Sequence, residues 1–199
     1  SDFICEWWEN QDPVTLITRP RRFGKTLNMS MLENFFSIQA YDRKDLFDGL
    51  EIWEDKKYRE LQGSYPVIFL SFASVKGETY TEAREGIIQI LLDLYTKYDY
   101  LCQGQKLSEK EKAYFDFVRV DMSNTIAAMS LHRLALCMNK YYGKKVLILL
   151  DEYDTPLQEA YVRGYWNELT SFMSNLFNAT FKTNPYMERG LLTGITRVS

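Results

Sequence analysis

The sequence predicts an α/β fold with a parallel sheet, because short apolar segments alternate with longer segments of helical periodicity. Four segments are short, rich in Val, Ile and Leu, and bounded by turn residues, which is typical of strands buried on both faces. They span residues 14–17, 66–72, 145–150 and 190–195. Helices are therefore expected on both faces of the sheet, giving a three-layer α/β/α arrangement.

A helical insertion is expected between the second and third strands. Two of its helices should begin at capping boxes, in which Thr or Ser is followed three residues later by Glu, at residues 79–82 and 108–111. A third helix is expected from about residue 125 to 142, ending near Gly143, a normal C-cap residue. Residues 73–144 should thus form a helical layer on the sheet.

Further helices are expected directly after the first and third strands. After the first strand, apolar residues recur every four positions and form a stripe: Leu27, Met31 and Phe35. After the third strand, Asp154 is expected to cap a helix that starts at Pro156, a residue suited to the first helical turn. Gly164 should interrupt this region, with a second helix beginning near Trp166.

Length and composition indicate one globular domain. The 199 residues are enough for one buried core, and 46% hydrophobic with 26% charged residues argues against disorder. No apolar stretch approaches a membrane span, and the start does not resemble a signal peptide. Three widely spaced cysteines without a metal-ligand pattern indicate reduced thiols, so a cytoplasmic location is expected.

The net charge of −3 disfavours one class of function. Non-specific nucleic-acid binding draws its affinity from Lys and Arg at phosphates, so direct nucleic-acid binding by this domain is not expected. Arg19, Arg21 and Arg22 nevertheless form a local basic cluster. Because the chain begins Ser1-Asp2 without Met, it is expected to be a piece of a longer protein.

Residues 19–26, Arg-Pro-Arg-Arg-Phe-Gly-Lys-Thr, form the most informative motif of the chain. A strand, a tight turn ending in Gly-Lys-Thr and a helix are the context that a phosphate-binding loop requires. The helix start offers backbone N–H groups and a positive dipole end to an anion. Lys25 is expected to reach the terminal phosphates, and the Thr26 hydroxyl to ligate Mg²⁺. Arg19 stands where the consensus has its first glycine.

A second motif lies at the end of the third strand, where an apolar run is followed by Asp151 and Glu152. In phosphate-loop enzymes a strand-end aspartate holds Mg²⁺ together with the Ser or Thr of the loop. An adjacent glutamate can accept a proton from an attacking water. The alternative interpretation is two surface acids at a strand terminus. The two motifs together favour a nucleotide site, because both would converge at the carboxyl edge of a parallel sheet.

These motifs resemble one known family, the predicted AAA-ATPase-like proteins, which are bacterial P-loop ATPases often followed by a restriction-endonuclease-like nuclease domain. The resemblance is carried in order by residues 16–27, 65–70, 150–157 and 192–198, which span nearly the whole chain. In this family the Arg-Pro-Arg-Arg loop is usual, so the resemblance makes Arg19 a family trait. Proline fixes the turn there, and a glycine is not needed.

The resemblance implies a P-loop NTPase core of the additional-strand type that uses ATP and Mg²⁺. It also implies that residues 1–199 are a truncated core, which lacks a last strand, a helical lid and the nuclease-like domain. The implied nucleotide contacts are the loop residues Arg19, Pro20, Arg21, Arg22, Phe23, Gly24, Lys25, Thr26 and Leu27. Nothing in the sequence identifies a subunit arrangement or an arginine supplied by a neighbour.

Two residues after the fourth strand, Thr196 and Arg197, have two interpretations. In related ATPases a polar residue here positions the attacking water or senses the γ-phosphate; alternatively, both are strand-end residues that face solvent. Arg21 and Arg22 likewise have more than one interpretation, because a guanidinium can contact a phosphate, a neighbouring acid or solvent.

The sequence therefore predicts an ATP-binding, Mg-dependent ATPase core. Lys25, Glu152 and Arg197 are the candidate catalytic residues, and Thr26 and Asp151 the candidate metal ligands. Two alternatives are a nucleotide-dependent switch that hydrolyses ATP slowly and a degenerate phosphate loop that serves only as an interaction scaffold. What hydrolysis would drive is open; a conformational or nucleic-acid-processing task of a fused or partner domain is expected.

Overall fold

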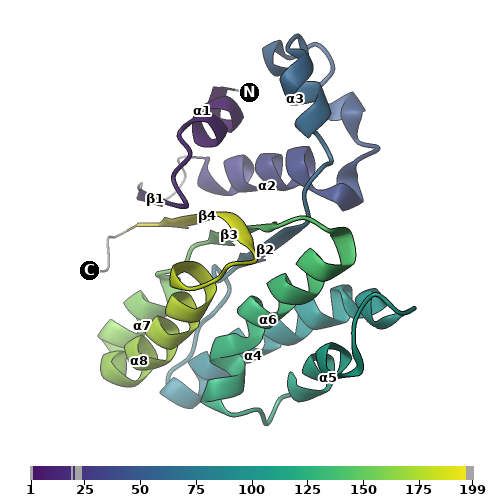
Figure 1. The fold of residues 1–199 in the computed structure, drawn as a ribbon. Helices are drawn as coiled ribbons and strands as arrows, with labels where there is room; N and C mark the ends of the chain where they lie inside the picture. The colour runs from purple at the N-terminus through teal and green to yellow at the C-terminus, as the bar shows by residue number, and fades with distance from the viewer. Residues whose placement is uncertain (1, 19, 21–23, 196–199) are drawn as a thin grey trace.

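The computed structural model of the chain describes residues 2–18, 20 and 24–195, with the backbone but not the side chain of Lys25. Within these residues lie four parallel strands that form one sheet (Figure 1). They are β1 (Val14–Thr18), β2 (Val67–Ser71), β3 (Val146–Asp151) and β4 (Met187–Gly194). The predicted α/β fold with a parallel sheet is confirmed.

The strands follow the spatial order β1-β4-β3-β2, so the last strand of the chain lies between the first and the third. Leu16 of β1 aligns with Leu192 of β4, which in turn aligns with Leu150 of β3. This order brings the carboxyl ends of β1, β4 and β3 next to one another. Residues far apart in the chain thereby meet at a single edge of the sheet.

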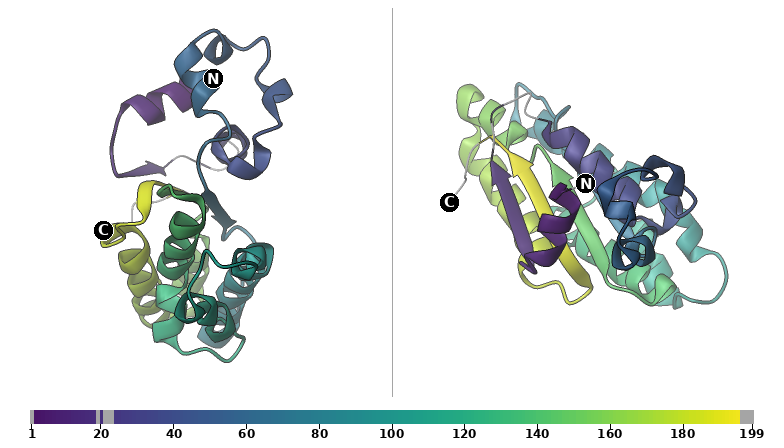
Figure 2. Two further views of the ribbon diagram at one scale, coloured as in Figure 1. Left: turned by 45° about the vertical axis from the view of Figure 1, so that its right-hand side comes forward. Right: turned by 90° about the horizontal axis from the view of Figure 1, so that it is seen from above.

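Helices cover both faces of the sheet (Figures 1 and 2). One face carries α1 (Asp2–Glu9), α2 (Lys25–Phe36) and α3 (Lys56–Leu61), with three short 3-10 turns before α3: η1 (Ile38–Ala40), η2 (Lys44–Leu46) and η3 (Glu51–Trp53). The other face carries α4 (Tyr80–Lys97), the 3-10 turn η4 (Asp99–Cys102), α5 (Glu109–Phe117), α6 (Asn124–Tyr142), α7 (Thr155–Arg163), α8 (Trp166–Phe177) and the π-turn η5 (Asn178–Lys182).

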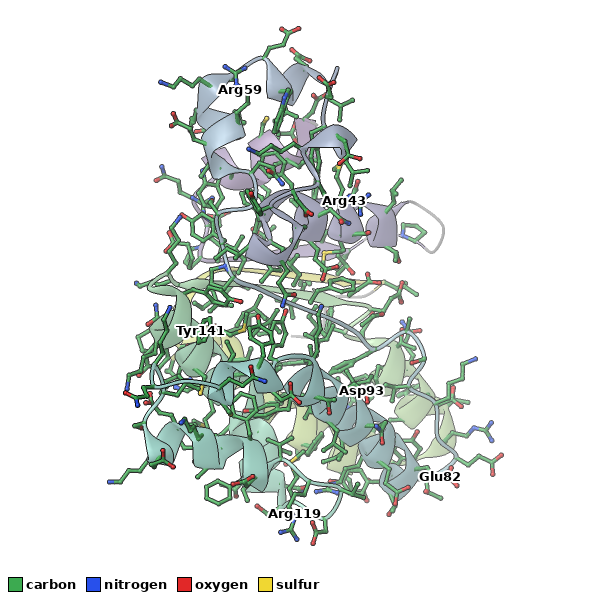
Figure 3. All side chains as sticks on the ribbon, turned by 90° about the vertical axis from the view of Figure 1, so that its right-hand side faces the viewer. Arg43, Arg59, Glu82, Asp93, Arg119 and Tyr141 are labelled. Carbon is green, nitrogen blue, oxygen red and sulfur yellow. The ribbon has the colours of Figure 1, made fainter. Side chains whose placement is uncertain are left out.

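The central strand β3 shows why two layers form. All six of its residues are buried, and successive side chains point to opposite faces. Leu147 and Leu149 pack with α1 and α2, whereas Ile148 and Leu150 pack with the helices of the opposite face. Charged side chains such as Arg59, Glu82 and Arg119 are exposed at the outer surface of the layers (Figure 3).

The predicted helical insertion between β2 and β3 is confirmed, and it contains α4, α5 and α6. Ser108 and Glu111 form the predicted reciprocal capping box. Thr79 caps α4 as predicted, but the Glu82 carboxylate accepts from the N–H of Glu78 instead of Thr79. α6 and α7 end at Gly143 and Gly164, as predicted. The fourth strand was predicted to start at residue 190, whereas β4 starts three residues earlier, at Met187.

Across the described part of the chain, none of the helices combines the length and apolar character needed to span a bilayer.

Candidate functional site

The N-terminus of α2 lies at the carboxyl edge of the sheet, where Thr26 contacts Asp151 at the end of β3. Gly24 is the N-cap of α2 and adopts the left-handed conformation, with φ 74° and ψ 16°, which glycine tolerates at low cost. The first bond of the helical ladder runs from the N–H of Asn28 to the Gly24 carbonyl, at 3.0 Å. The N–H groups of Lys25, Thr26 and Leu27 therefore precede the ladder and point along the helix axis, as an anion site requires.

Thr26 and Asp151 form the central contact of the site. The Thr26 hydroxyl donates to Asp151 Oδ2 at 3.1 Å, across 125 positions of sequence. Asp151 is the last residue of β3 and is almost fully buried, with 1% of its surface exposed, whereas Thr26 is exposed in the first turn of α2. The contact thus joins the helix after the loop to the end of the central strand.

Two further hydroxyls from neighbouring strands contact the Asp151 carboxylate. Thr193 of β4 donates to Oδ1 at 2.6 Å, and Ser71 of β2 donates to Oδ2 at 3.4 Å. Both strands adjoin β3 in the sheet, so the parallel register brings their last polar residues to Asp151. A buried carboxylate requires such donors, because an ionised group without them is costly to bury.

Glu152 follows directly and leaves the strand in an unusual conformation. Its φ is 54°, which is uncommon for a residue with a side chain and occurs preferentially at functional sites. Its N–H donates to Thr193 Oγ1 at 3.2 Å, and its Oε2 accepts from the Thr155 hydroxyl at 2.9 Å. The backbone and the carboxylate of Glu152 are therefore both held by neighbouring hydroxyls.

Asp154 differs from the prediction. It occupies the N-cap position of α7, but its side chain makes no capping hydrogen bond. Its Oδ2 instead accepts from the N–H of Ile195 at 2.8 Å and from Gln158 Nε2 at 3.3 Å. The fully buried carboxylate thereby fastens the chain just past the end of β4 to α7. A helix-capping rule considers only the residues at the start of the helix, so it cannot predict a hydrogen bond from Ile195, just past the end of a strand.

The donor set at Thr26, Asp151 and Ser71 suits a hard cation. All three offer oxygen atoms, and Mg²⁺ is usually held by one or two protein oxygen ligands together with substrate phosphates and water. Over residues 2–18, 20 and 24–195, no group of three or more His, Cys, Asp and Glu residues has the arrangement of a metal site.

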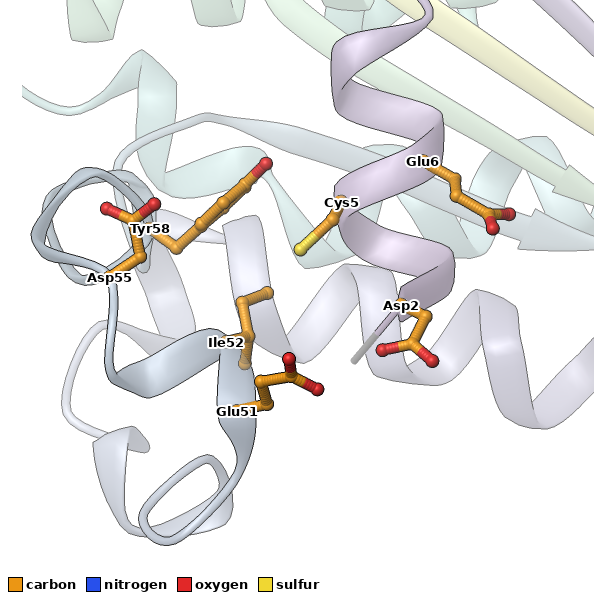
Figure 4. Close-up of a pocket in the computed structure, with 7 residues that line it drawn as sticks. All are labelled: Asp2, Cys5, Glu6, Glu51, Ile52, Asp55 and Tyr58. Carbon is orange, nitrogen blue, oxygen red and sulfur yellow. The ribbon is translucent and has the colours of Figure 1, made fainter.

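A cavity of about 320 Å³ lies elsewhere in the molecule and is lined by acidic side chains (Figure 4). It lies between α1 and the η3–α3 segment, and its lining includes four carboxylates: Asp2, Glu6, Glu51 and Asp55. A concentration of negative charge repels a phosphate. This cavity is therefore not a candidate for the nucleotide.

Comparison with known proteins agrees with the geometry. The model of the family described as "Predicted AAA-ATPase" matches residues 1–199. The chain belongs to this family. The resemblance expected from the motifs is thereby confirmed, and membership in a predicted AAA-ATPase family supports nucleotide binding in general.

One curated relative of this AAA-ATPase-like chain is the "Uncharacterized protein in vnfD 5'region" of Azotobacter chroococcum mcd 1. The two are 25% identical over 184 residues, which cover 92% of this chain and 30% of the relative. The chain thus spans less than a third of the length of that relative. No solved structure shows a significant match to the chain.

The structure of this AAA-ATPase-like chain places some of the predicted site residues together. Thr26, Asp151 and Glu152 meet at one edge of the sheet, with Gly24, the Lys25 backbone and Leu27 at the start of α2. Pro20 is exposed. Six predicted residues lie outside the described part: Arg19, Arg21, Arg22, Phe23, Thr196 and Arg197.

Three site residues were missed in the sequence: Ser71, Thr155 and Thr193. Ser71 ends the otherwise apolar strand β2, and Thr193 directly follows Leu191 and Leu192 near the end of β4; a polar residue in such a position is a recognisable signal. The strand-end polar residues proposed from the sequence were Thr196 and Arg197 instead. Thr155 carries no comparable signal, because a Thr at a helix start is common.

Proposed function

We propose that this chain is the ATP-binding, Mg-dependent ATPase core of a P-loop protein of the additional-strand type. The observation that carries the proposal is the 3.1 Å hydrogen bond between Thr26 and Asp151. It joins the hydroxyl after a Gly-Lys turn to the aspartate at the end of a buried strand, as the shared ligation of one metal ion requires. The position of β4 between β1 and β3 further supports the additional-strand assignment.

In this proposal the start of α2 binds the phosphates. The N–H groups of Lys25, Thr26 and Leu27 and the positive end of the helix dipole attract the anion. The Lys25 ammonium supplies a positive charge for the β and γ phosphates. Arg19, Pro20, Arg21, Arg22 and Phe23 complete the loop. Preorganised charge of this kind accounts for most of the catalysis of phosphoryl transfer.

Thr26 and Asp151 would hold Mg²⁺, with Ser71 beside them. When bound, the ion neutralises charge on the phosphate oxygens. Because Asp151 Oδ1 is occupied by Thr193, Oδ2 is the oxygen directed toward Thr26. ATP is preferred over GTP because the family consists of predicted ATPases.

Glu152 is proposed as the general base that accepts a proton from the attacking water. Thr196 and Arg197, two and three residues past the end of β4, are proposed to contact the γ-phosphate or the water. The Thr155 hydroxyl donates to Glu152 Oε2 at 2.9 Å and would orient the carboxylate for this role. The alternative is a nucleotide-dependent switch that binds ATP and hydrolyses it slowly.

Two substitutions test the proposal in the full-length protein. Calorimetry with ATP and Mg²⁺ should show binding by the wild type and a large loss in Lys25→Ala, because the helix N-terminus then lacks its cation. Absence of ATP binding by the wild type would overturn the proposal and leave the interaction-scaffold alternative.

Glu152→Gln separates an ATPase from a switch. It keeps the shape of the side chain but removes its basicity, so ATP should still bind while turnover falls by roughly 10²–10⁴-fold. Turnover equal to that of the wild type would show that Glu152 is not the base. A wild type that binds ATP tightly but turns it over only very slowly would favour the switch. The task that hydrolysis drives, such as nucleic-acid processing by a fused nuclease-like domain, is a further proposal from the family resemblance.

A further inference from the structure

We propose that Thr193 is a positioning residue that orients both acids of the site, Asp151 and Glu152. This inference rests on the proposed function. Thr193 lies in β4, between β1 and β3, and has only 2% of its surface exposed. Its hydroxyl contacts both Asp151 and Glu152. No other hydroxyl described above touches both residues.

The direction of each hydrogen bond follows from chemistry. A backbone N–H can only donate, so the Thr193 oxygen must accept from Glu152 N at 3.2 Å. The single hydroxyl proton is then available for Asp151 Oδ1, which lies at 2.6 Å. This short distance is typical of a hydroxyl that donates to an ionised carboxylate. The Thr193 hydroxyl thus donates a hydrogen bond to the carboxylate of Asp151 and accepts one from the backbone N–H of Glu152.

The two bonds have different consequences for the site. The bond to Oδ1 orients the Asp151 carboxylate so that Oδ2 is the oxygen shared with Thr26 and Ser71. The bond from Glu152 N stabilises the left-handed turn, φ 54°, that carries the Glu152 side chain out of the strand. The Thr193 carbonyl also accepts from the N–H of Tyr153 at 2.9 Å, which extends the strand contact past Glu152.

Strand pairing on both sides of β4 holds the Thr193 hydroxyl in a fixed position. Its backbone pairs with Ile17 of β1 on one side, and the preceding residue Leu192 pairs with Leu150 of β3 on the other. A site supported by paired central strands is held more precisely than one supported by loops. Partners of metal-ligating carboxylates in turn tune the metal affinity. Removal of this hydroxyl should therefore weaken metal binding without removing a metal ligand.

The test compares Thr193→Val, which keeps the shape but lacks the hydroxyl, with Thr193→Ser, which keeps the hydroxyl. Mn²⁺ affinity is measured by electron paramagnetic resonance in the full-length protein saturated with a non-hydrolysable ATP analogue, and turnover is measured with ATP and Mg²⁺. Thr193→Val should weaken Mn²⁺ binding by roughly 10–100-fold and lower kcat comparably. The affinity for the analogue without metal should change little, and Thr193→Ser should recover most of both losses.

The matched control is Thr180→Val. Thr180 is also fully buried, and its hydroxyl donates to the Leu176 carbonyl at 2.7 Å, but it lies in η5 and touches neither acid. This variant should lose some stability and keep the Mn²⁺ affinity of the wild type. If Thr193→Val does not fold, Thr193→Ala replaces it, because it also lacks the hydroxyl and adds no atoms.

The outcomes separate this inference from the proposed function. Wild-type Mn²⁺ affinity and kcat in the folded variant without the hydroxyl would overturn the positioning role and leave the ATPase proposal intact. Equal losses in Thr193→Ser and Thr193→Val would also overturn it, because packing and not the hydroxyl would then be responsible. A wild type that binds no analogue would overturn both.

Discussion

Thr26 Oγ1 lies 3.1 Å from Asp151 Oδ2, and this pair connects the two halves of the candidate site. Thr26 comes from the helix after the phosphate-loop motif, and Asp151 from the end of the central strand. Either motif alone is short and has a substantial false-positive risk. Their contact in the folded chain is the observation from which a shared ligand is proposed.

Thr26→Val is expected to weaken the Mg²⁺ dependence of the site. The substitution removes the hydroxyl that is proposed to ligate the ion but keeps the side-chain shape, so the Mg²⁺ concentration for half-maximal turnover should rise by roughly 10-fold or more. Thr26→Ser keeps the hydroxyl and is the control. An unchanged Mg²⁺ dependence in Thr26→Val, with turnover intact, would contradict the assignment of Thr26 as a ligand.

Gly194→Ala is expected to destabilise the fold at the site. An added Cβ would lie 2.5 Å from Tyr153 Cε1 and 2.8 Å from Asp154 Oδ1, both on buried side chains. Overpacking of this kind costs about 1–3 kcal/mol in the free energy of unfolding, which urea denaturation measures.

Gly86→Ala is the control for Gly194. It lies within α4, and its added Cβ would meet only Val75 Cγ1, at an ordinary 3.5 Å. Because alanine is the better helix former, this substitution should be neutral or stabilise by up to about 1 kcal/mol. A Gly194→Ala variant as stable as Gly86→Ala would refute the close packing described for the end of β4.

Glu111→Gln should destabilise the chain in a pH-dependent way. Burial acts to raise the pKa of Glu111, but hydrogen bonds from Lys140 and from Ser108 outweigh it and hold the pKa below its ordinary value of 4.5. A lowered folded-state pKa contributes stability above the unfolded pKa, and this contribution is lost as the pH falls through the folded value.

The unfolding free energy of Glu111→Gln should therefore be lower than that of the wild type by about 1 kcal/mol at pH 7. The difference should shrink below pH 4.5, which chemical denaturation at several pH values measures. Glu109→Gln is the control, because its carboxylate is 94% exposed and its ion pair with Lys112 should contribute less than about 0.5 kcal/mol. A constant difference between pH 7 and pH 3 would contradict the role of the Glu111 charge.

Arg189→Met should loosen the N-terminal helix. Arg189 of β4 donates to the carbonyls of Trp7 and Trp8 at the end of α1, and its guanidinium lies 4.1 Å from the centre of the Trp8 ring. A cation at a helix C-terminus and charged hydrogen bonds are each favourable. The free energy of unfolding should fall by about 2 kcal/mol, and hydrogen exchange should show weaker protection of α1.

Arg163→Met is the matched control for Arg189. Its ion pair with Glu159 at 3.2 Å is partly exposed on α7, so its loss should cost at most about 0.5 kcal/mol. If both substitutions had the same small effect, the contact between Arg189 and α1 would not stabilise the helix.

The sequence by itself determined most of the elements and both motifs. Alternating apolar and helical segments predicted the parallel sheet and both helical layers, because burial on two faces requires apolar strands. Ser108, Gly143 and Gly164 marked helix ends correctly, since capping depends on a few neighbouring residues. The Gly-Lys-Thr and Asp-Glu motifs indicated the candidate site for the same reason, because each motif consists of neighbouring residues.

Only the tertiary structure decided which groups meet. The strand order places β4 between β1 and β3, and this order brings Thr193 to Asp151 and Ile195 to Asp154. The partner of Asp154 was wrong in the sequence-based prediction because a local capping rule cannot include a strand end 41 residues away. Local sequence determines where helices and strands begin and end, whereas the contacts of buried polar groups depend on packing between distant segments.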